Sequence, residues 1–424
     1  MTSLRDIGYD LPSAIADLVD NSVDAGASTV TITVGRSGGA SFIRIADNGH
    51  GMTDRVLDEA MRYGSRRTYD PTNLGKFGLG LKTASLSQCR RLTVASRTTL
   101  RGQIRVRRWD LDNVRTRDAW ELERLLPSEC MPYFLEPLGR GPGTVVLWEK
   151  IDRILEYARP DGEYALRTLE ALSVSVAEHL AMVFHRFLSG QTRDKRRLDI
   201  IFNGEQLSPW DPFARAEQAT RKLPVQHVPV EHRGQGYAVE VRAYVLPSQA
   251  QFTTLEAHAT AAGPKKWNRQ QGFYIYRGDR MIQSGGWNRL RTMDEHSKLA
   301  RISIDIPPEL EDLFQINVAK MRVVLPDLMR PHLRALASGV VTRAQEAYRR
   351  RLRLVESATE HAERLAASEQ MGGVTIGDLW PTIADVLCRE LHAYPDLLDR
   401  VLIALANTRS PRPEPAAVAA AGSS

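Results

Sequence analysis

The segment from Gly75 to Ser85, GKFGLGLKTAS, limits the kind of phosphate-binding fold that this chain can adopt. A P-loop reads G-x-x-x-x-G-K-[ST], but here Leu81 separates Gly80 from Lys82. The Rossmann fingerprint does not match either, because the third glycine that it requires is missing here. Both motifs also need a buried strand before the loop, whereas this chain has the polar segment YGSRRTYDPTNL there. Two interpretations remain. Either this is an ordinary loop, or its glycines turn backbone N–H groups around an anion and residues 79–92 form a helix that faces it.

Composition excludes several classes of protein. The 424 residues are enough for two or three domains, and 42% hydrophobic and 25% charged residues are typical of soluble globular chains. We expect no membrane span, because no run of eighteen apolar residues occurs, and no secretory signal. Three widely spaced cysteines fit a reduced cytoplasm. The net charge of +6 permits nucleic-acid binding without requiring it.

The pattern of elements predicts an α/β chain in four parts. Residues 1–155 alternate helices with strands, and residues 156–330 form a second α/β block. Residues 331–405 are mainly helical, and residues 406–424 are a disordered, Pro- and Ala-rich tail. Period-two alternation in the first part predicts a mixed or antiparallel sheet covered on one side. Its expected strands are 29–34, 42–46, 91–97, 103–109 and 144–150.

An amphipathic helix is predicted in LPSAIADLVDNSVDAGAS, with Pro12 in its first turn and its end at Gly26. Asp17 and Asn21 are four residues apart, so their side chains meet on one face. A carboxylate and an amide oxygen suit Mg²⁺, which keeps several waters and leaves room for phosphate oxygens. The alternative is a solvated acidic face.

A second acidic feature follows in IADNGHGM, where a strand ends at Asp47. Gly49 and Gly51 allow the backbone to come close to a ligand. A carboxylate at a strand end can accept a hydrogen bond from an exocyclic amine such as that of adenine. The alternative is an Asp-Asn-Gly turn without a ligand.

The order of these features is more specific than any of them alone. D-x-x-x-N, D-x-G-x-G and G-x-x-G-x-G, followed by Gly143-Thr144 at the start of a strand, resemble the motifs of the GHKL ATPase superfamily. That superfamily includes gyrase, the ninety-kilodalton heat-shock chaperone, histidine kinases and MutL. The resemblance covers the first 150 residues and implies the Bergerat fold, an α/β sandwich that binds ATP with Mg²⁺. Bacterial Morc-like and MutL-like proteins are the most similar in arrangement.

The resemblance implies a role for each matching residue. Asn21 would coordinate Mg²⁺, Asp47 would bind the adenine amine, and Thr144 would support it through water. Gly49, Gly51 and Met52 would line the base. The lid over the phosphates would be formed by Gly75, Lys76, Phe77, Gly78, Leu79, Gly80 and Leu81, with Lys82 matching a lysine of Morc-like members.

One departure from the family pattern affects catalysis. Hydrolysing members usually carry Glu as the general base, where this chain has Asp17, one methylene shorter. Base geometry is sensitive to such a change. We therefore expect a slow ATPase, with a nucleotide-binding scaffold or sensor that hydrolyses little or no ATP as the alternative.

The second block resembles the region after the ATPase domain in Morc-like bacterial proteins. Relatives of the gyrase and MutL type supply a lysine from this region to the γ-phosphate, and Lys320 is the candidate here. A cation there would neutralise charge that develops during phosphoryl transfer. Arg277 and Arg280 are the alternatives. Basic residues alternate with aromatics over 265–291, which predicts either a nucleic-acid grip or a core strand with a charged rim.

Together these features predict an ATP-gated dimeric switch or clamp. ATP would close two copies, which would then act on DNA or a partner protein within a DNA-processing or phage-defence system. A histidine kinase is disfavoured, because the first histidine, His50, falls inside the expected ATP site.

Overall fold

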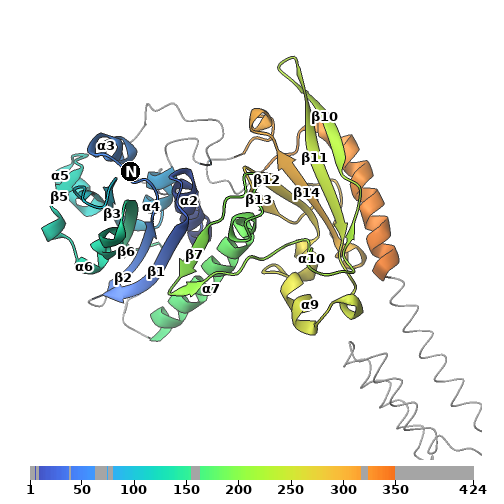
Figure 1. Cartoon of the computed structure of the whole chain (residues 1–424), viewed down its shortest axis with the longest axis horizontal. Coiled ribbons are helices and arrows are strands. Elements are labelled where there is room, and N and C mark those ends of the chain that lie inside the picture. The colour runs from blue at the N-terminus through green and yellow to red at the C-terminus, as the bar shows by residue number, and fades with distance from the viewer. Residues whose placement is uncertain are drawn as a thin grey trace, which may run out of the picture.

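The computed structural model describes Arg5 and residues 9–37, 40–62, 74, 80–153, 163–316 and 323–348. They form two α/β bodies side by side, each built on one large sheet (Figure 1). Helix α7 (Glu163–Val183) lies between the two bodies. It contacts α2 (Leu11–Asp24) in the first body and β13 (Arg280–Ser284) in the second. The predicted α/β class is confirmed.

The first sheet has eight strands in the order β5-β4-β3-β6-β2-β1-β7-β8. All neighbours are antiparallel except β1 and β7, which pair in parallel, so the predicted mixed sheet is confirmed. Because β7 and β8 follow α7, this sheet extends beyond residues 1–155. The strands are β1 (Thr29–Ser37), β2 (Ala40–Asp47), β3 (Cys89–Arg97), β4 (Arg105–Asp110), β5 (Glu123–Leu125), β6 (Gly143–Ile151), β7 (Asp199–Phe202) and β8 (Glu205–Gln206).

Alternating side chains of the first sheet enter two separate cores. In β6, Val146 and Trp148 belong to the main core, which includes buried residues of α2 and α4 (Gly80–Leu86). Val145 and Leu147 point to the opposite face and join a smaller cluster with Phe134 of α6 (Pro132–Leu135). The sequence predicted that one face of this sheet is covered. Short helical segments after β5 partly cover the other face as well.

Helix α2 begins where its sequence predicts. The Asp10 side chain accepts a hydrogen bond of 2.9 Å from the backbone N–H of Ser13, and Pro12 occupies the first turn. The helix ends at Asp24, two residues before Gly26, whose φ is +69°. The remaining helices of this body are α3 (Asp54–Met61) and α5 (Leu111–Arg117).

The helix predicted over residues 79–92 is shorter than expected. Helix α4 ends at Leu86, and strand β3 already begins at Cys89. The segment RLTVASR alternates with period two and pairs with both β4 and β6, so sheet pairing determines its structure.

The second body contains a six-stranded sheet in the order β10-β11-β14-β12-β13, with β9 paired to β11. Its inner strand β12 (Gly272–Arg277), between β14 and β13, is buried along its whole length. Phe273, Tyr274 and Tyr276 are therefore core residues, and the predicted nucleic-acid grip is wrong for these aromatic rings. The other elements are β9 (Arg221–Lys222), β10 (Gln226–His232), β11 (Gln235–Val245), α9 (Leu255–Ala261), α10 (Lys266–Gln270) and β14 (Ala300–Ile306). Helix α8 (His185–Leu188) lies between α7 and β7 in the chain and contacts both.

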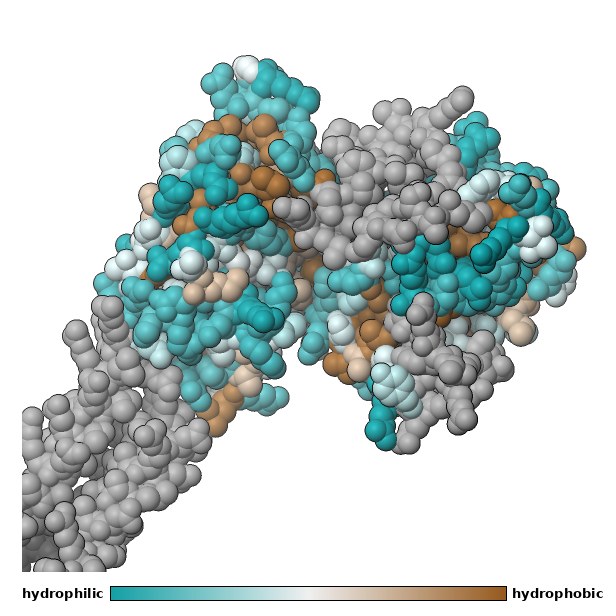
Figure 2. Space-filling view, turned by 180° about the vertical axis from the view of Figure 1, so that it is seen from behind, coloured by the Kyte–Doolittle hydropathy of each residue, from teal (hydrophilic) through white to brown (hydrophobic). Residues whose placement is uncertain are grey.

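The helical prediction after residue 331 is confirmed as far as residue 348, over a helix of residues 330–348. Leu333, Ala337, Val340 and Ala344 form its buried face. The predicted regions 349–405 and 406–424 lie outside the described residues. No helix in the described part of the chain has the length and apolar character needed to cross a membrane. Hydrophilic residues cover most of the surface seen from behind, with smaller hydrophobic patches between them (Figure 2).

Candidate functional site

Asp17 lies on α2 of the first body, with only 2% of its surface exposed. The Tyr9 hydroxyl donates a hydrogen bond of 2.7 Å to Asp17 Oδ2. Gly80, at the start of α4, lies so close that an added Cβ would be 3.8 Å from the same oxygen. Asp20 is fully buried as well, so the alternative of a solvated acidic face is wrong for both carboxylates. The candidate base therefore lies next to the end of the predicted lid.

An arginine from the second body reaches the two buried carboxylates. Arg280 Nε donates a hydrogen bond of 3.0 Å to Asp20 Oδ1, and Arg280 Nη2 lies 3.9 Å from Asp17 Oδ1. Arg280 itself is 2% exposed. The sequence marked Arg280 only as an alternative for the γ-phosphate contact. Its partners lie 260 or more positions away, a separation at which no local pattern indicates a contact.

Asn21, the predicted Mg²⁺ ligand, differs from Asp17 in being exposed at the surface of α2. Among the described residues, no cluster of three or more His, Cys, Asp or Glu side chains is placed to hold a metal ion. A magnesium ion bound at Asn21 would take most of its oxygen ligands from nucleotide phosphates and water, which fits the coordination habit of this ion.

Asp47 ends strand β2 in a half-buried position. Its Oδ1 accepts hydrogen bonds from the backbone N–H groups of Gly49 (2.9 Å) and Thr144 (3.2 Å), and its Oδ2 accepts one from the Ser22 hydroxyl (3.2 Å). Burial raises the pKa of the Asp47 carboxyl, and these hydrogen bonds oppose that rise. A carboxylate has about four acceptor positions, so three bonds leave capacity for an amine donor.

Thr144 lies beside Asp47 as expected, and it belongs to a small network that the sequence did not reveal. The Ser96 hydroxyl is 3.0 Å from Thr144 Oγ1, donates to the carbonyl of Gly143, and accepts a hydrogen bond of 2.8 Å from the N–H of Met52. Ser96 thus joins the end of β3 to the loop that carries Met52. In the sequence it is simply the next-to-last residue of a strand.

The glycines of the D-x-G-x-G motif have a backbone role. Gly51 has φ +67°, and an added Cβ there would collide with the carbonyl oxygen of Arg97. At Gly49 an added Cβ would come within 2.8 Å of the Ala25 Cβ and carbonyl oxygen. A side chain at either position would move the loop that carries Asp47 and Met52.

The predicted lid is described only at its end. Gly75, Lys76, Phe77, Gly78 and Leu79 lie outside the described residues, as does Lys320. Gly80 and Leu81 begin α4. Lys82 is fully buried, and its ammonium group donates hydrogen bonds to the carbonyl oxygens of Ala60 (2.9 Å) and Arg62 (2.5 Å) at the end of α3. Burial lowers the pKa of Lys82 to about 8. A phosphate contact by Lys82 stays a prediction.

Comparison with known proteins agrees with this geometry. Residues 9–137 match the family model described as histidine kinase-, DNA gyrase B- and HSP90-like ATPase. This part of the chain is a GHKL ATPase domain. The matched range contains the Asp17 and Asp47 motifs and α4, and it ends before Thr144.

Similarity to curated relatives extends past the ATPase domain. The DNA mismatch repair protein MutL of Rhodospirillum rubrum is 26% identical over 330 residues, which are 74% of this chain and 46% of that protein. MutL of Salmonella arizonae is 40% identical over 216 residues, 50% of this chain and 30% of that protein. MutL of Haemophilus influenzae is 40% identical over 91 residues, which are 20% of this chain and 14% of that protein. The chain therefore spans less than half the length of these relatives.

Proposed function

We propose that this chain is a slow, Mg²⁺-dependent ATPase whose general base is Asp17. The observation that carries the proposal is the buried Asp17 carboxylate, oriented by Tyr9 and placed beside the first residue of α4. A base fixed in this way can hold an attacking water in line with a phosphate covered by the lid. The match of residues 9–137 to an ATPase family supports the same reaction.

The remaining roles follow from position on the same scaffold. Asp47 would receive the adenine amine, with Thr144 beside it and Gly49, Gly51 and Met52 around the base. Asn21 would hold Mg²⁺, which supplies charge neutralisation at the phosphates when bound. The loop from Gly75 to Leu81 would cover the phosphates, with Lys82 at its end. Lys320 would bring a cation from the second body to the γ-phosphate.

We further infer that ATP gates the association of two copies, which then act on DNA or a partner protein. Support comes from the second α/β body docked against the ATPase domain and from the resemblance to relatives named for DNA mismatch repair. A DNA-processing or phage-defence setting in the cytoplasm fits this switch.

The dimer proposal is tested by sedimentation of the full chain with and without a non-hydrolysable ATP analogue and Mg²⁺. The account predicts a shift from monomer to dimer for the wild type and no shift for Asn21→Ala. The exposed Asn21 side chain makes this substitution harmless to folding, so unfolding midpoints should agree. A dimer that forms equally without nucleotide, or equally in the variant, would contradict gating through this site.

DNA binding is tested separately by titrating duplex and single-stranded DNA at several salt concentrations. Contacts with phosphates release counterions, so affinity should fall steeply as salt rises. No binding at low salt would remove DNA from the proposal and leave a partner protein as the target.

A nucleotide-ordered scaffold is the second candidate, and one observation favours it. Asp17 has a shorter side chain than the Glu usual in hydrolysing relatives, and its buried carboxylate is fixed by Tyr9, so it cannot advance toward a distant water. Nucleotide binding without phosphate release would select this alternative.

A further inference from the structure

The hairpin of strands β12 and β13 in the second body contacts the ATPase domain directly. Its turn contains Gly278 and Asp279 and is flanked by Arg277 and Arg280. Both arginines are buried, with 3% and 2% of their surface exposed. Arg280 hydrogen-bonds Asp20 at 3.0 Å and lies 3.9 Å from Asp17. This one hairpin therefore reaches the helix that carries the candidate base.

The same hairpin also contacts Leu74, the residue directly before the predicted lid. Arg277 Nη1 donates a hydrogen bond of 3.1 Å to the carbonyl of Leu74, and Arg277 Nε pairs with Glu311 of its own body at 3.0 Å. The N–H of Leu74 donates in turn to Asp24 Oδ1 of α2 at 2.9 Å. Leu74 is thus held between α2 and the hairpin, directly before the predicted lid.

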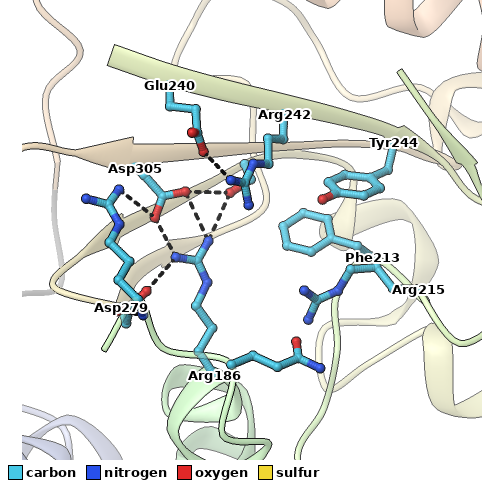
Figure 3. Close-up of a pocket in the computed structure, with 11 residues that line it drawn as sticks. Arg186, Phe213, Arg215, Glu240, Arg242, Tyr244, Asp279 and Asp305 are labelled. Carbon is cyan, nitrogen blue, oxygen red and sulfur yellow. Dashed lines mark hydrogen bonds and ion pairs between the residues drawn. The ribbon is translucent and has the colours of Figure 1, made fainter. Parts of the chain in front are cut away.

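The segment between α7 and β7 holds the turn of the hairpin. Arg186 of α8 donates to Asp279 at 3.0 Å, and the backbone N–H of Arg193 donates to the other Asp279 oxygen at 2.8 Å. Arg186 is also paired with Asp305 of β14, as the close-up shows (Figure 3). Asp279 is thus bound by the segment between α7 and β7, which Arg186 also joins to Asp305 of β14, so the position of Arg280 depends on these contacts as well as on α2.

The position of the Arg280 guanidinium affects the ionisation of Asp17. Asp17 and Asp20 are buried one turn apart on α2, and two like charges in a low-dielectric setting disfavour ionisation of both. The Arg280 guanidinium faces both carboxylates and offsets that repulsion. A second body that moved away would leave the two carboxylates facing each other without this cation.

We propose that Arg280 is a positioning residue that keeps Asp17 ionised and oriented, so that base catalysis depends on docking of the β12–β13 hairpin. The inference rests on the proposed ATPase function. It differs from a γ-phosphate contact, because Arg280 acts on the base and its Nε is already bound to Asp20. The effect of the second body on ATP hydrolysis would then depend on the contact of one guanidinium group, that of Arg280.

Two other basic groups lie on described elements packed against α2, and neither is directed at Asp17 as a cation. Among the described residues, the titratable or charged side chains on α2 and on the elements packed against it include Tyr9, Asp10, Asp20, Asp24, Arg280, His179 on α7 and Lys82 on α4. Burial lowers the pKa of His179 to about 4, so it is neutral at ordinary pH. Lys82 directs its ammonium group to the carbonyls of Ala60 and Arg62.

The test is the pH dependence of ATP turnover by the full chain, with ATP affinity measured directly in each variant. Removing a nearby cation favours the neutral carboxyl, so Arg280→Gln should move the acidic limb of the turnover profile to higher pH by about one unit or more. Asp20→Asn removes a like charge and should move the same limb to lower pH. ATP affinity should stay within about threefold of the wild type in both, because neither side chain is assigned to the nucleotide.

Two matched variants separate positioning from packing. Arg280→Lys keeps the charge and should return the acidic limb toward the wild-type position. Arg277→Gln removes the neighbouring buried arginine of the same hairpin, which pairs with Glu311 and not with Asp17, so its acidic limb should stay in place. The ionisation of ATP is common to all these variants and cancels in the comparison.

The outcomes distinguish this inference from the proposed function. An acidic limb of the turnover profile that stays in place in both Arg280→Gln and Asp20→Asn would overturn the role of Arg280. So would a shift of that limb in Arg277→Gln equal to the shift in Arg280→Gln. Neither result would contradict ATP hydrolysis itself. Should Arg280→Gln fail to fold, the double variant Asp20→Asn/Arg280→Gln removes the buried pair together, and its acidic limb should lie at higher pH than that of Asp20→Asn. Absence of turnover in the wild type at every pH would instead remove the ATPase proposal itself.

Discussion

The Tyr9 hydroxyl and Asp17 Oδ2 are joined by a buried hydrogen bond of 2.7 Å. Burial, followed by the charge of Asp17, raises the pKa of Tyr9, so the phenol keeps its proton and stays a donor at ordinary pH. Tyr9 precedes α2 and fixes one oxygen of the carboxylate, while Arg280 faces the other. The candidate base is therefore oriented from both sides before any ligand arrives.

Tyr9→Phe should lower ATP turnover and leave nucleotide affinity nearly unchanged. A hydrogen bond to a charged group contributes about 1.5–3 kcal/mol, so turnover should fall roughly tenfold to a hundredfold if the bond orients the base. The matched control is Tyr237→Phe, which removes a hydroxyl bonded to Gln235 in the second sheet. Equal turnover in the two variants would contradict the orienting role.

Asp47→Ala should abolish the preference for adenine nucleotides. The substitution removes the carboxylate that is proposed to accept the base amine, whereas the lid and Asn21 remain. Competitive binding of ATP and GTP measures the effect as a ratio, which is insensitive to a partial loss of folded protein. A variant that still prefers ATP would show that Asp47 serves only the turn formed with Gly49 and Thr144.

Lys82 should make stability depend on alkaline pH. Its pKa of about 8 in the folded chain lies below the ordinary value of 10.5, so the unfolded chain binds more protons between these values. The free energy of unfolding should therefore rise through this window, by on the order of 3 kcal/mol from this group.

Lys82→Met provides the comparison for that measurement. Denaturant unfolding at pH 8 and at pH 10 should give a smaller rise for the variant than for the wild type. An identical rise in both would show that the ammonium group is not buried against α3. ATP affinity measured on the same variant tests the separate prediction that Lys82 contacts phosphate.

Lys320→Ala should lose turnover and keep ATP binding. The proposed cation acts on charge that develops during transfer, so its removal affects the chemical step more than the ground state. Single-turnover phosphate release with saturating ATP measures that step. Wild-type turnover in this variant would assign the γ-phosphate contact elsewhere.

The sequence predicted the helices and strands of the ATPase domain better than it predicted which of their residues are buried and which distant residues they contact. Local patterns were sufficient for α2 and for strand β6, because capping and period-two alternation are properties of neighbouring residues. They failed at α4, where pairing of β3 with two other strands ended the expected helix. They also left a solvated face open for Asp17, because burial by a distant part of the chain leaves no local signature.

Residues that complete the site were missed, or in the case of Arg280 given a different role, for the same physical reason. Ser22, Ser96 and Arg280 are linked to Asp47, Thr144 and Asp20 across 25, 48 and 260 positions. Motif spacing indicates residues that touch a ligand, but not residues that hold those residues in place. For the aromatic residues of β12, the sequence offered a ligand contact where the structure has a core strand. Buried strands and surfaces that stack nucleic-acid bases are both rich in aromatic residues, so composition does not separate them.

The most direct measurement is phosphate release from Mg²⁺-ATP by the pure chain and by Asp17→Asn, with nucleotide affinity titrated for both. Asp17→Asn keeps the size of the side chain and can still accept the Tyr9 hydrogen bond, but it cannot take a proton from water. The account predicts turnover in the wild type, at least a hundredfold loss in the variant, and similar ATP affinity. Equal turnover in both proteins, or none in a wild type that binds ATP, would contradict Asp17 as the catalytic base.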